Sequence, residues 1–289
     1  MKLADIQPLL EYMVKRHAIW DRRYSGFPKP WTKDPILQTY KFCNVYRELD
    51  KVTQWVDGAI RKPFAEHPNL WLMLCIARMI NWPDTLHELI ACPEAGVWPR
   101  TSTWKPLKMR AVMQRRAARG EKVYTGAYML RGPIQGDPSG FQDKPHYTAV
   151  RVIQPLWEAR SKLEPQLHGT LADAFSAFKG YHGWGDFLIA QVIADLKHTR
   201  YLRNAPDWWD WAVLGPGSLK GLNILTGKPL GASWKQENAL SALREIQAAA
   251  KKHTHLKPLC LQDVQNNLCE FSKYTRGYCR SLYPGKLDE

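Results

Sequence analysis

The sequence lacks the segments that would place it in a membrane or in a secreted, cross-linked fold. No apolar run approaches the roughly 20 consecutive residues that a spanning helix requires. Residues 1–8 do not show the charged and then apolar layout of a signal peptide. The six cysteines include no C-x-x-C pair, which indicates neither a zinc site nor a disulfide framework. We therefore expect a cytoplasmic protein with reduced thiols and no metal site.

The common catalytic motifs are missing as well. The sequence contains no G-x-x-x-x-G-K-[ST], no H-E-x-x-H, no G-x-S-x-G and no G-x-G-x-x-G after a strand. The nine histidines are isolated in the sequence, which is typical of structural or exposed positions. A P-loop phosphotransfer mechanism is disfavoured, and no cofactor is indicated.

Acidic residues are scarce relative to basic ones. The 27 Asp and Glu face 41 Lys and Arg, giving a formal net charge of +14 and a pI near 9.5. This excess favours a polyanionic partner such as nucleic acid or an anionic membrane surface, although a soluble enzyme can also simply be basic. The hydrophobic content of 45% is enough for a real core. The 13 Trp pack mainly in that core, and some are suited to stack on exposed bases.

Helical periodicity dominates the N-terminal half. Apolar residues recur every three to four positions over 40–56 and over 70–81, which predicts two amphipathic helices, the second closed by Pro83. Residues 100–122 carry eight basic residues and one acid, and Pro106 is expected to begin a helix there. This helix is either an ordinary solvated surface helix or one that contacts phosphates.

A single all-α domain of two lobes is expected. The Gly- and Pro-rich segment 131–147 predicts a loop between lobes at about 1–130 and 148–289. No convincing strand, internal repeat or low-complexity tract is present. Further helices are predicted at 150–163, 171–178, 186–197 and 238–252.

Two glycine motifs are suited to bind DNA phosphates. Gly183 and Gly185 lie between two predicted helices, as in a helix-hairpin-helix, and backbone N–H groups near Asp186–Leu188 would receive the anion. The alternative is a plain tight turn. Gly215 and Gly217, with Ser218 and Lys220 behind them, are a second phosphate-cradling candidate. On the helix after the hairpin, Gln191 and Asp195 share one face of a mainly apolar helix, so they are either hydrogen-bonded internally or face a site.

Taken together, several stretches resemble a bacteriophage family of helical proteins related to DNA glycosylases. The family comprises the helical domain of 5-hydroxymethyl-deoxyuridine DNA kinases and the stand-alone amino acid:DNA or putrescine:DNA transferases, also described as glutamyl/putrescinyl thymine pyrophosphorylases. The resemblance lies in 42–54 (FCNVYRELDKVTQ), 78–85 (RMINWPDT), 125–129 (TGAYM), 183–187 (GWGDF) with Gln191 and 195–196, 215–222 (GPGSLKGL) and 263–276 (DVQNNLCEFSKYTR). Two departures are a missing P-loop domain, which favours the transferase branch, and Ser272, where an acidic residue is expected.

The resemblance implies a reaction on double-stranded DNA that carries phosphorylated 5-hydroxymethyluracil. An amine, such as glycine, another amino acid or putrescine, displaces the phosphate or pyrophosphate from the flipped base. The product helps a phage genome evade host restriction, and the expected location is the host cytoplasm. No cofactor, no metal and no membrane are expected.

On this template we assign hypothetical roles to the matching residues. Arg47, Arg78 and Lys273 are candidates for holding the leaving phosphate. Asp50, Asp195 and Glu270 are candidates for accepting the amine's proton or binding the amine. The alternative for the pairs 47/50 and 270/273 is an ordinary ion pair one helical turn apart. The remaining expected substrate contacts are Asn44 and Asn81, which would read the uracil edge, and Gln191, Tyr274 and Arg276.

Two other functions stay open. A helix-hairpin-helix glycosylase would need an Asp about twenty residues after the hairpin, and Asp207 lies 22 beyond Gly185. A non-catalytic DNA-binding protein would bind in a salt-dependent way and leave the DNA covalently unchanged.

Overall fold

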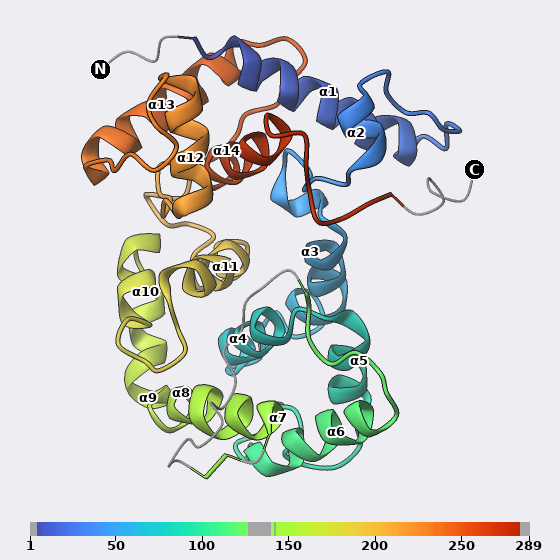
Figure 1. Cartoon of the computed structure of the whole chain (residues 1–289). Helices are drawn as coiled ribbons and strands as arrows, with labels where there is room; N and C mark the ends of the chain where they lie inside the picture. Colours follow the sequence, from blue (N-terminus) through green and yellow to red (C-terminus); the bar gives the residue numbers. More distant parts are fainter. Residues whose placement is uncertain (1–4, 127–139, 142, 284–289) are drawn as a thin grey trace. The chain divides into compact units, whose positions relative to one another are not determined.

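The described part of the chain is built from helices (Figure 1). The computed structural model describes residues 5–126, 140–141 and 143–283. Within these ranges the β structure amounts to one isolated bridge between Tyr40 and Leu282. No helix found there is long and apolar enough to cross a lipid bilayer. The all-α expectation is confirmed.

The chain divides into two compact units. Unit 1 comprises Met1–Asp50 and Trp209–Glu289, and unit 2 comprises Lys51–Trp208. This division differs from the lobes expected at 1–130 and 148–289. Most of the expected connecting loop lies outside the described residues, and its last part forms the short helix α7 (Lys144–His146), capped by the carboxylate of Asp143.

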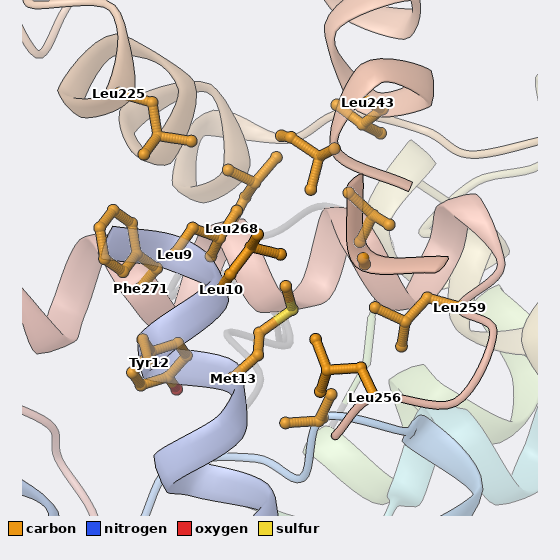
Figure 2. Close-up of a cluster of buried hydrophobic side chains, with 14 of the residues drawn as sticks. Leu9, Leu10, Tyr12, Met13, Leu225, Leu243, Leu256, Leu259, Leu268 and Phe271 are labelled. Atoms are coloured by element: carbon orange, nitrogen blue, oxygen red, sulfur yellow. The ribbon is translucent and has the colours of Figure 1, made fainter. Parts of the chain in front are cut away.

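Unit 1 is formed by helices from both ends of the chain. Helix α14 packs against α1, α12 and α13. Figure 2 shows its core, in which Leu9, Leu10 and Met13 of α1 lie in one buried cluster with Leu268 and Phe271 of α14. Its elements are α1 (Gln7–Tyr24), α2 (Pro35–Thr39), η1 (Arg47–Leu49), α12 (Pro216–Leu225), α13 (Gln236–Lys251) and α14 (Leu261–Tyr274).

Two glycines allow α12 to approach α14 closely. A Cβ at Gly221 would lie 2.3 Å from the carbonyl oxygen of Leu268, and one at Gly217 would lie 2.4 Å from the Sγ of Cys269. Any side chain would therefore separate the two helices. Gly217, which the sequence suggested as a phosphate contact, has this packing role in unit 1.

Unit 2 is centred on α4, whose eleven residues are all buried and which packs against α11. The predicted helix at 70–81 is confirmed, but Pro83 does not end it. Asn81 ends α4 in the left-handed conformation at φ 47°, and Pro83 occupies the first turn of α5. The elements of unit 2 are α3 (Lys51–Val56), η2 (Asp57–Arg61), α4 (Leu70–Ile80), α5 (Pro83–Ala91), α6 (Pro106–Ala118), α7, η3 (Tyr147–Ile153), α8 (Gln154–Glu158), α9 (Arg160–Leu163), η4 (Glu164–Leu167), α10 (Leu171–Ala177) and α11 (Asp186–Leu196).

The helix predicted over 40–56 is wrong for residues 40–46. Residues 41–46 are not helical, and regular helix begins only with the short turn η1 and with α3. The backbone of Phe42, Cys43 and Asn44 is hydrogen-bonded to side chains from elsewhere in unit 1 instead of to its own helix. Tertiary hydrogen bonds therefore override the local apolar pattern.

The basic segment 100–122 contains α6, which begins at Pro106 as expected and buries Met109, Val112 and Met113. Half of its cations are ion-paired, which favours the surface-helix alternative for these residues. The pairs are Lys108 with Glu94, Arg110 with Asp143, Arg116 with Glu88 and Glu121, and Arg119 with Glu88 and Glu121.

Candidate functional site

The non-helical segment 42–44 in unit 1 is held between side chains of α1 and α14. Arg16 of α1 is 2% exposed, and its Nη2 donates to the Phe42 carbonyl at 2.8 Å and to Asn44 Oδ1 at 2.8 Å. From α14, the Oε2 of Glu270 accepts a hydrogen bond from the Cys43 backbone N–H at 3.1 Å. Two buried charged groups thus fix this segment from both sides.

Asp50 closes the same segment and keeps one carboxylate oxygen available. Its Oδ1 accepts from the Asn44 backbone N–H at 2.8 Å and from Asn44 Nδ2 at 3.2 Å. Its Oδ2 has no hydrogen-bond partner among the described residues, and Asp50 is only partly buried.

The pKa of Asp50 is raised above the usual aspartate value. Burial is the main cause, because it disfavours the charged carboxylate, and the nearby charge of Glu270 adds to it. The hydrogen bond from Asn44 and the positive charges of Arg47 and Arg16 act in the opposite direction but do not outweigh burial. Asp50 therefore holds a proton more readily than an ordinary aspartate.

Glu270 and Lys273 form the one-turn ion pair that the sequence left as an alternative. Lys273 Nζ lies 2.5 Å from Glu270 Oε1, and Glu270 is 4% exposed. Burial disfavours the charged form of Lys273, but the attraction of Glu270 outweighs it, so that the pKa of Lys273 is raised above its ordinary value. The side chain of Lys273 is 35% exposed. Lys273 therefore keeps its positive charge more firmly than an ordinary lysine, and solvent can reach it.

Cys43 lies within electrostatic reach of four of these groups. Although residue 43 as a whole is exposed, desolvation by the surrounding groups raises the pKa of its thiol well above the usual value, and the charges of Glu270 and Asp50 raise it further. Lys273 and Arg47 act on the same thiol in the opposite sense. Two carboxylates and two cations, all named from the sequence, therefore gather around residue 43 in unit 1.

Asn44 supports Asp50 and has little hydrogen-bonding capacity left for a base. Its Nδ2 donates to the Leu49 carbonyl at 2.7 Å as well as to Asp50, and its Oδ1 accepts from Arg16. Asn44 therefore orients the carboxylate of Asp50.

In unit 2 the structure brings together Arg78, Asn81 and Asp195. Arg78 pairs with Asp195 through two hydrogen bonds, one from Nε to Oδ2 and one from Nη2 to Oδ1 at 2.7 Å. Arg78 also donates to Thr53 Oγ1 at 3.1 Å and to Asn81 Oδ1 at 3.4 Å. Asp195 is fully buried, and Arg61 Nη1 lies 3.9 Å from its Oδ1. This network accounts for both oxygens of Asp195, so its contacts are those of a structural ion pair.

Sequence similarity to known proteins covers both units. Residues 5–282 match the family described as "5-hmdU DNA kinase, helical domain". The chain belongs to this family. It is 26% identical to a 5-hmdU DNA kinase of Bacillus phage SP10 over 289 aligned residues, which cover 92% of this chain and 44% of the relative. The chain thus spans less than half the length of that kinase. No solved structure matches it.

The remaining predicted site residues of this chain lie apart from the Asp50 group or are engaged elsewhere. Tyr274 donates from its hydroxyl to Asp34 at 2.6 Å. Arg276 is exposed, and its Nε donates to the Ser272 carbonyl at 2.7 Å near the end of α14. Ser272, at the position where an acid was expected, is 1% exposed and bonds back to the Cys269 carbonyl. Gln191 is buried on α11.

The two glycine motifs form tight turns before helices. Gly183 has φ 81°, and a Cβ there would lie 2.9 Å from Val152, so packing alone explains this glycine. Gly185 caps α11, where the Leu188 N–H already donates to the Gly185 carbonyl and Asp186 adds a negative charge. Such a charge weakens anion binding at a helix start.

The motif at Gly215 and Gly217 also forms a tight turn before a helix. Gly215 caps α12, and its N–H donates to Ser218 Oγ at 3.1 Å. Lys220 is partly buried on the same helix. DNA binding by these motifs therefore stays a prediction.

Three buried residues that take part in these clusters were not singled out from the sequence. They are Arg16, Thr53 and Arg61. For Arg16 a signal exists, because an arginine on the same helical face as Leu9, Tyr12 and Met13 must be satisfied inside the protein. No comparable pattern marks Thr53.

Proposed function

We propose that this chain is a phage DNA-modifying transferase that replaces the phosphate or pyrophosphate of phosphorylated 5-hydroxymethyl-deoxyuridine in DNA with an amine. The amine is an amino acid such as glycine, or putrescine, and the hypermodified thymidine protects the genome from host restriction. The observation that carries the proposal is the available Oδ2 of Asp50 in a group that also contains Arg47 and Lys273. The family to which the chain belongs supports 5-hmdU DNA as the substrate class.

The reaction requires a base for the incoming amine. An ammonium group is not nucleophilic until it loses a proton, and Asp50 Oδ2 accepts this proton. The freed nitrogen lone pair forms a bond to the 5-methylene carbon of the base. The carbon–oxygen bond breaks, and its electron pair leaves with the phosphate or pyrophosphate. The raised pKa of Asp50 makes it a better proton acceptor than an ordinary aspartate.

The departing group requires positive charge. Arg47, whose charge acts on Asp50, and Lys273, which keeps its proton because Glu270 attracts it and whose charge acts on the neighbouring Cys43, supply this charge. Glu270 contacts the Cys43 backbone and Lys273, so it is a positioning residue. The target base also has to leave the helical stack to meet both groups.

Phosphorylation by ATP is the other reaction that the family name suggests. The kinases that the sequence resembles use a P-loop for it, and G-x-x-x-x-G-K-[ST] does not occur in these 289 residues. We therefore assign to these residues the displacement step, which needs a base and cations but no nucleotide cradle.

Base excision receives less support. Asp207, the aspartate that a glycosylase would use, accepts from the backbone N–H groups of Leu171 and Ala172 at 2.7 and 3.1 Å. Its carboxylate thus caps the start of α10. Both carboxylate oxygens of Asp207 therefore have a structural partner.

Mass spectrometry of nucleosides tests the proposal. DNA containing phosphorylated 5-hydroxymethyluracil is incubated with the full chain and a mixture of amino acids and polyamines. We expect a new amine-bearing thymidine, whose mass also identifies the donor. Abasic sites would support the glycosylase, and DNA that is bound but unchanged would support a purely binding role; either result overturns the transferase.

Glu270→Gln separates chemistry from binding in the same assay. The variant removes the charge that holds Lys273, so we expect slower turnover with DNA affinity largely retained. The conservative variant Lys273→Arg keeps the cation and should retain more activity than Lys273→Met. Equal turnover of Glu270→Gln and the wild type would remove Glu270 from the mechanism.

A further inference from the structure

Unit 1 carries a ladder of three stacked aromatic rings along α1, which runs from the mostly buried His17 through Trp20 to the exposed Tyr24. The rings of His17 and Trp20 stack with centroids 5.9 Å apart and an angle of 9°, and those of Trp20 and Tyr24 stack at 4.9 Å and 12°. Tyr24 is 78% exposed, so the outer end of the stack is open to solvent. The His17 side chain is only 11% exposed and Trp20 is partly buried, so these two rings hold the exposed ring of Tyr24 as a flat surface on which a base can stack.

Positive charge surrounds the open end of this ladder. Every residue from 21 to 30, where α1 ends and the loop to α2 begins (Figure 1), is exposed. Between positions 21 and 33 the sequence has four Lys and Arg and a single acid, Asp21. Arg23 and Lys29 lie over the ring of Trp31 at 5.0 and 5.6 Å from its centroid. These cation–π contacts limit the freedom of both cations and thereby reduce the entropy lost on binding an anion.

The inner end of the ladder is next to the segment that contains Arg47 and Asp50. His17 contacts the ring of Tyr46 at 4.9 Å, and Tyr46 directly precedes Arg47. The hydroxyl of Tyr46 is hydrogen-bonded to the backbone of Lys257 at 2.6 and 3.1 Å. The segment 251–257, which contains three lysines and two histidines, therefore borders the same surface. We call His17, Trp20, Tyr24 and Tyr46, together with the cations of 22–29 and 251–257, the aromatic and basic band of unit 1.

We propose that this band binds unpaired nucleotides of the DNA strand that flanks the modified base. A nucleobase extends the stack on the outer face of Tyr24, while Arg22, Arg23 and Lys29 neutralise phosphates. The combination of exposed rings and cations is the one that binds single strands without sequence preference, because every base has a stacking face. The choice of DNA as the ligand rests on the proposed function. The excess of cations over acids at 21–33 favours a polyanion such as DNA over a protein partner.

Fluorescence anisotropy with a labelled thymidine strand of about 12 nucleotides tests the band. We expect Tyr24→Ala to weaken binding by the full chain roughly tenfold, which corresponds to the loss of one stacked base. Tyr24→Phe keeps the ring and should bind like the wild type. Tyr278→Ala is the matched control, because Tyr278 is also an exposed tyrosine of unit 1, 58% exposed, but lies outside the ladder. It should leave the affinity unchanged.

Two outcomes overturn the proposal. One is equal affinity of Tyr24→Ala and Tyr278→Ala for the single strand. The other is an equal loss of affinity for a fully paired duplex, which offers no free base to stack. Neither outcome depends on catalysis, so the strand-binding proposal and the transferase proposal can be refuted independently. If Tyr24→Ala weakens binding to the single strand, the strand-binding proposal holds even when the wild type forms no amine-bearing thymidine.

Discussion

The carboxylate of Asp50 is the group whose chemistry can be separated most clearly from its structural contacts. Asp50→Asn preserves the size of the side chain and an oxygen that accepts from Asn44. It removes the ability to take a proton at Oδ2. We predict that single-turnover amine transfer falls by about 10²- to 10⁴-fold, with unchanged DNA affinity by anisotropy. A decrease smaller than about tenfold would show that another group is the base.

The raised pKa of Asp50 leads to a second prediction, which concerns how amine transfer and stability depend on pH. The base is active only when ionised, so transfer should rise with pH through the folded-state pKa, which lies above the ordinary aspartate value. Stability should change in the opposite direction. Because folding disfavours the ionised form, the free energy of unfolding should fall as pH rises from the unfolded-state pKa through the folded-state pKa. Urea titrations of the wild type and Asp50→Asn across the acid range measure this, since the variant should lack the dependence.

At the scale of single residues, the sequence predicted the composition of the unit 1 group better than the roles of its members. Asp50, Glu270 and Lys273 were named, and they do gather around Cys43. Asn44 was assigned to base reading, yet its amide is occupied by Arg16 and Asp50. A pattern of residue types shows which groups are unusual, but hydrogen-bond partners distant in sequence decide what each group is free to do.

Among the helices, the contact between α12 and α14 gives the sharpest prediction. The Cβ that Gly221→Ala would add lies 2.3 Å from the backbone oxygen of Leu268, which cannot turn aside as a side chain can. We expect a loss of about 1–3 kcal/mol in the free energy of unfolding, measured by urea denaturation. Gly58→Ala is the control, because a Cβ at this exposed glycine of η2 meets nothing within 4 Å. If both variants are equally stable, the close approach of the two helices is not what Gly221 provides.

The pair of buried charges that joins α4 to α11 allows a comparable test. Arg78→Met alone leaves Asp195 buried without its main partner, and we expect a cost of about 3–5 kcal/mol. Asp195→Leu should cost a similar amount for the opposite reason. The double variant should be more stable than the sum of the two losses predicts, because neither charge is then left alone. Additive losses in urea denaturation would mean that the two side chains do not depend on each other.

Helices were predicted correctly from sequence where their own residues decide the structure. The apolar run of α4 and the proline that begins α6 are examples of such local signals. The segment before α3 was predicted to be helical because its apolar spacing fits, but Arg16 and Glu270 bind its backbone and prevent a helix. Those partners lie 26 and 227 residues away, so no local window contains them.

For the molecule as a whole, neither the division into units nor the placement of charge follows from local composition. Unit 1 joins the two ends of the chain because α1 and α14 share one core. Each unit has seven more Lys and Arg than Asp and Glu, which together give the net charge of +14. Attraction for a polyanion is therefore a property of both units and not of one basic lobe.

This distribution leads to a prediction about salt. If the chain contacts six to ten phosphates through cations of both units, its affinity for duplex DNA should fall by about 10³- to 10⁵-fold between roughly 50 and 200 mM salt. Arg115 is exposed on α6 and has no ion-pair partner among the described residues, whereas Arg119 is held by Glu88 and Glu121. Arg115→Gln should therefore reduce the slope of log affinity against log salt by about 0.9 if α6 contacts a phosphate, and Arg119→Gln should reduce it less. Anisotropy titrations over this salt range measure both slopes. Equal slopes for the wild type and Arg115→Gln would mean that Arg115 of α6 contacts water and no phosphate. The phosphate contacts would then be made by other cations.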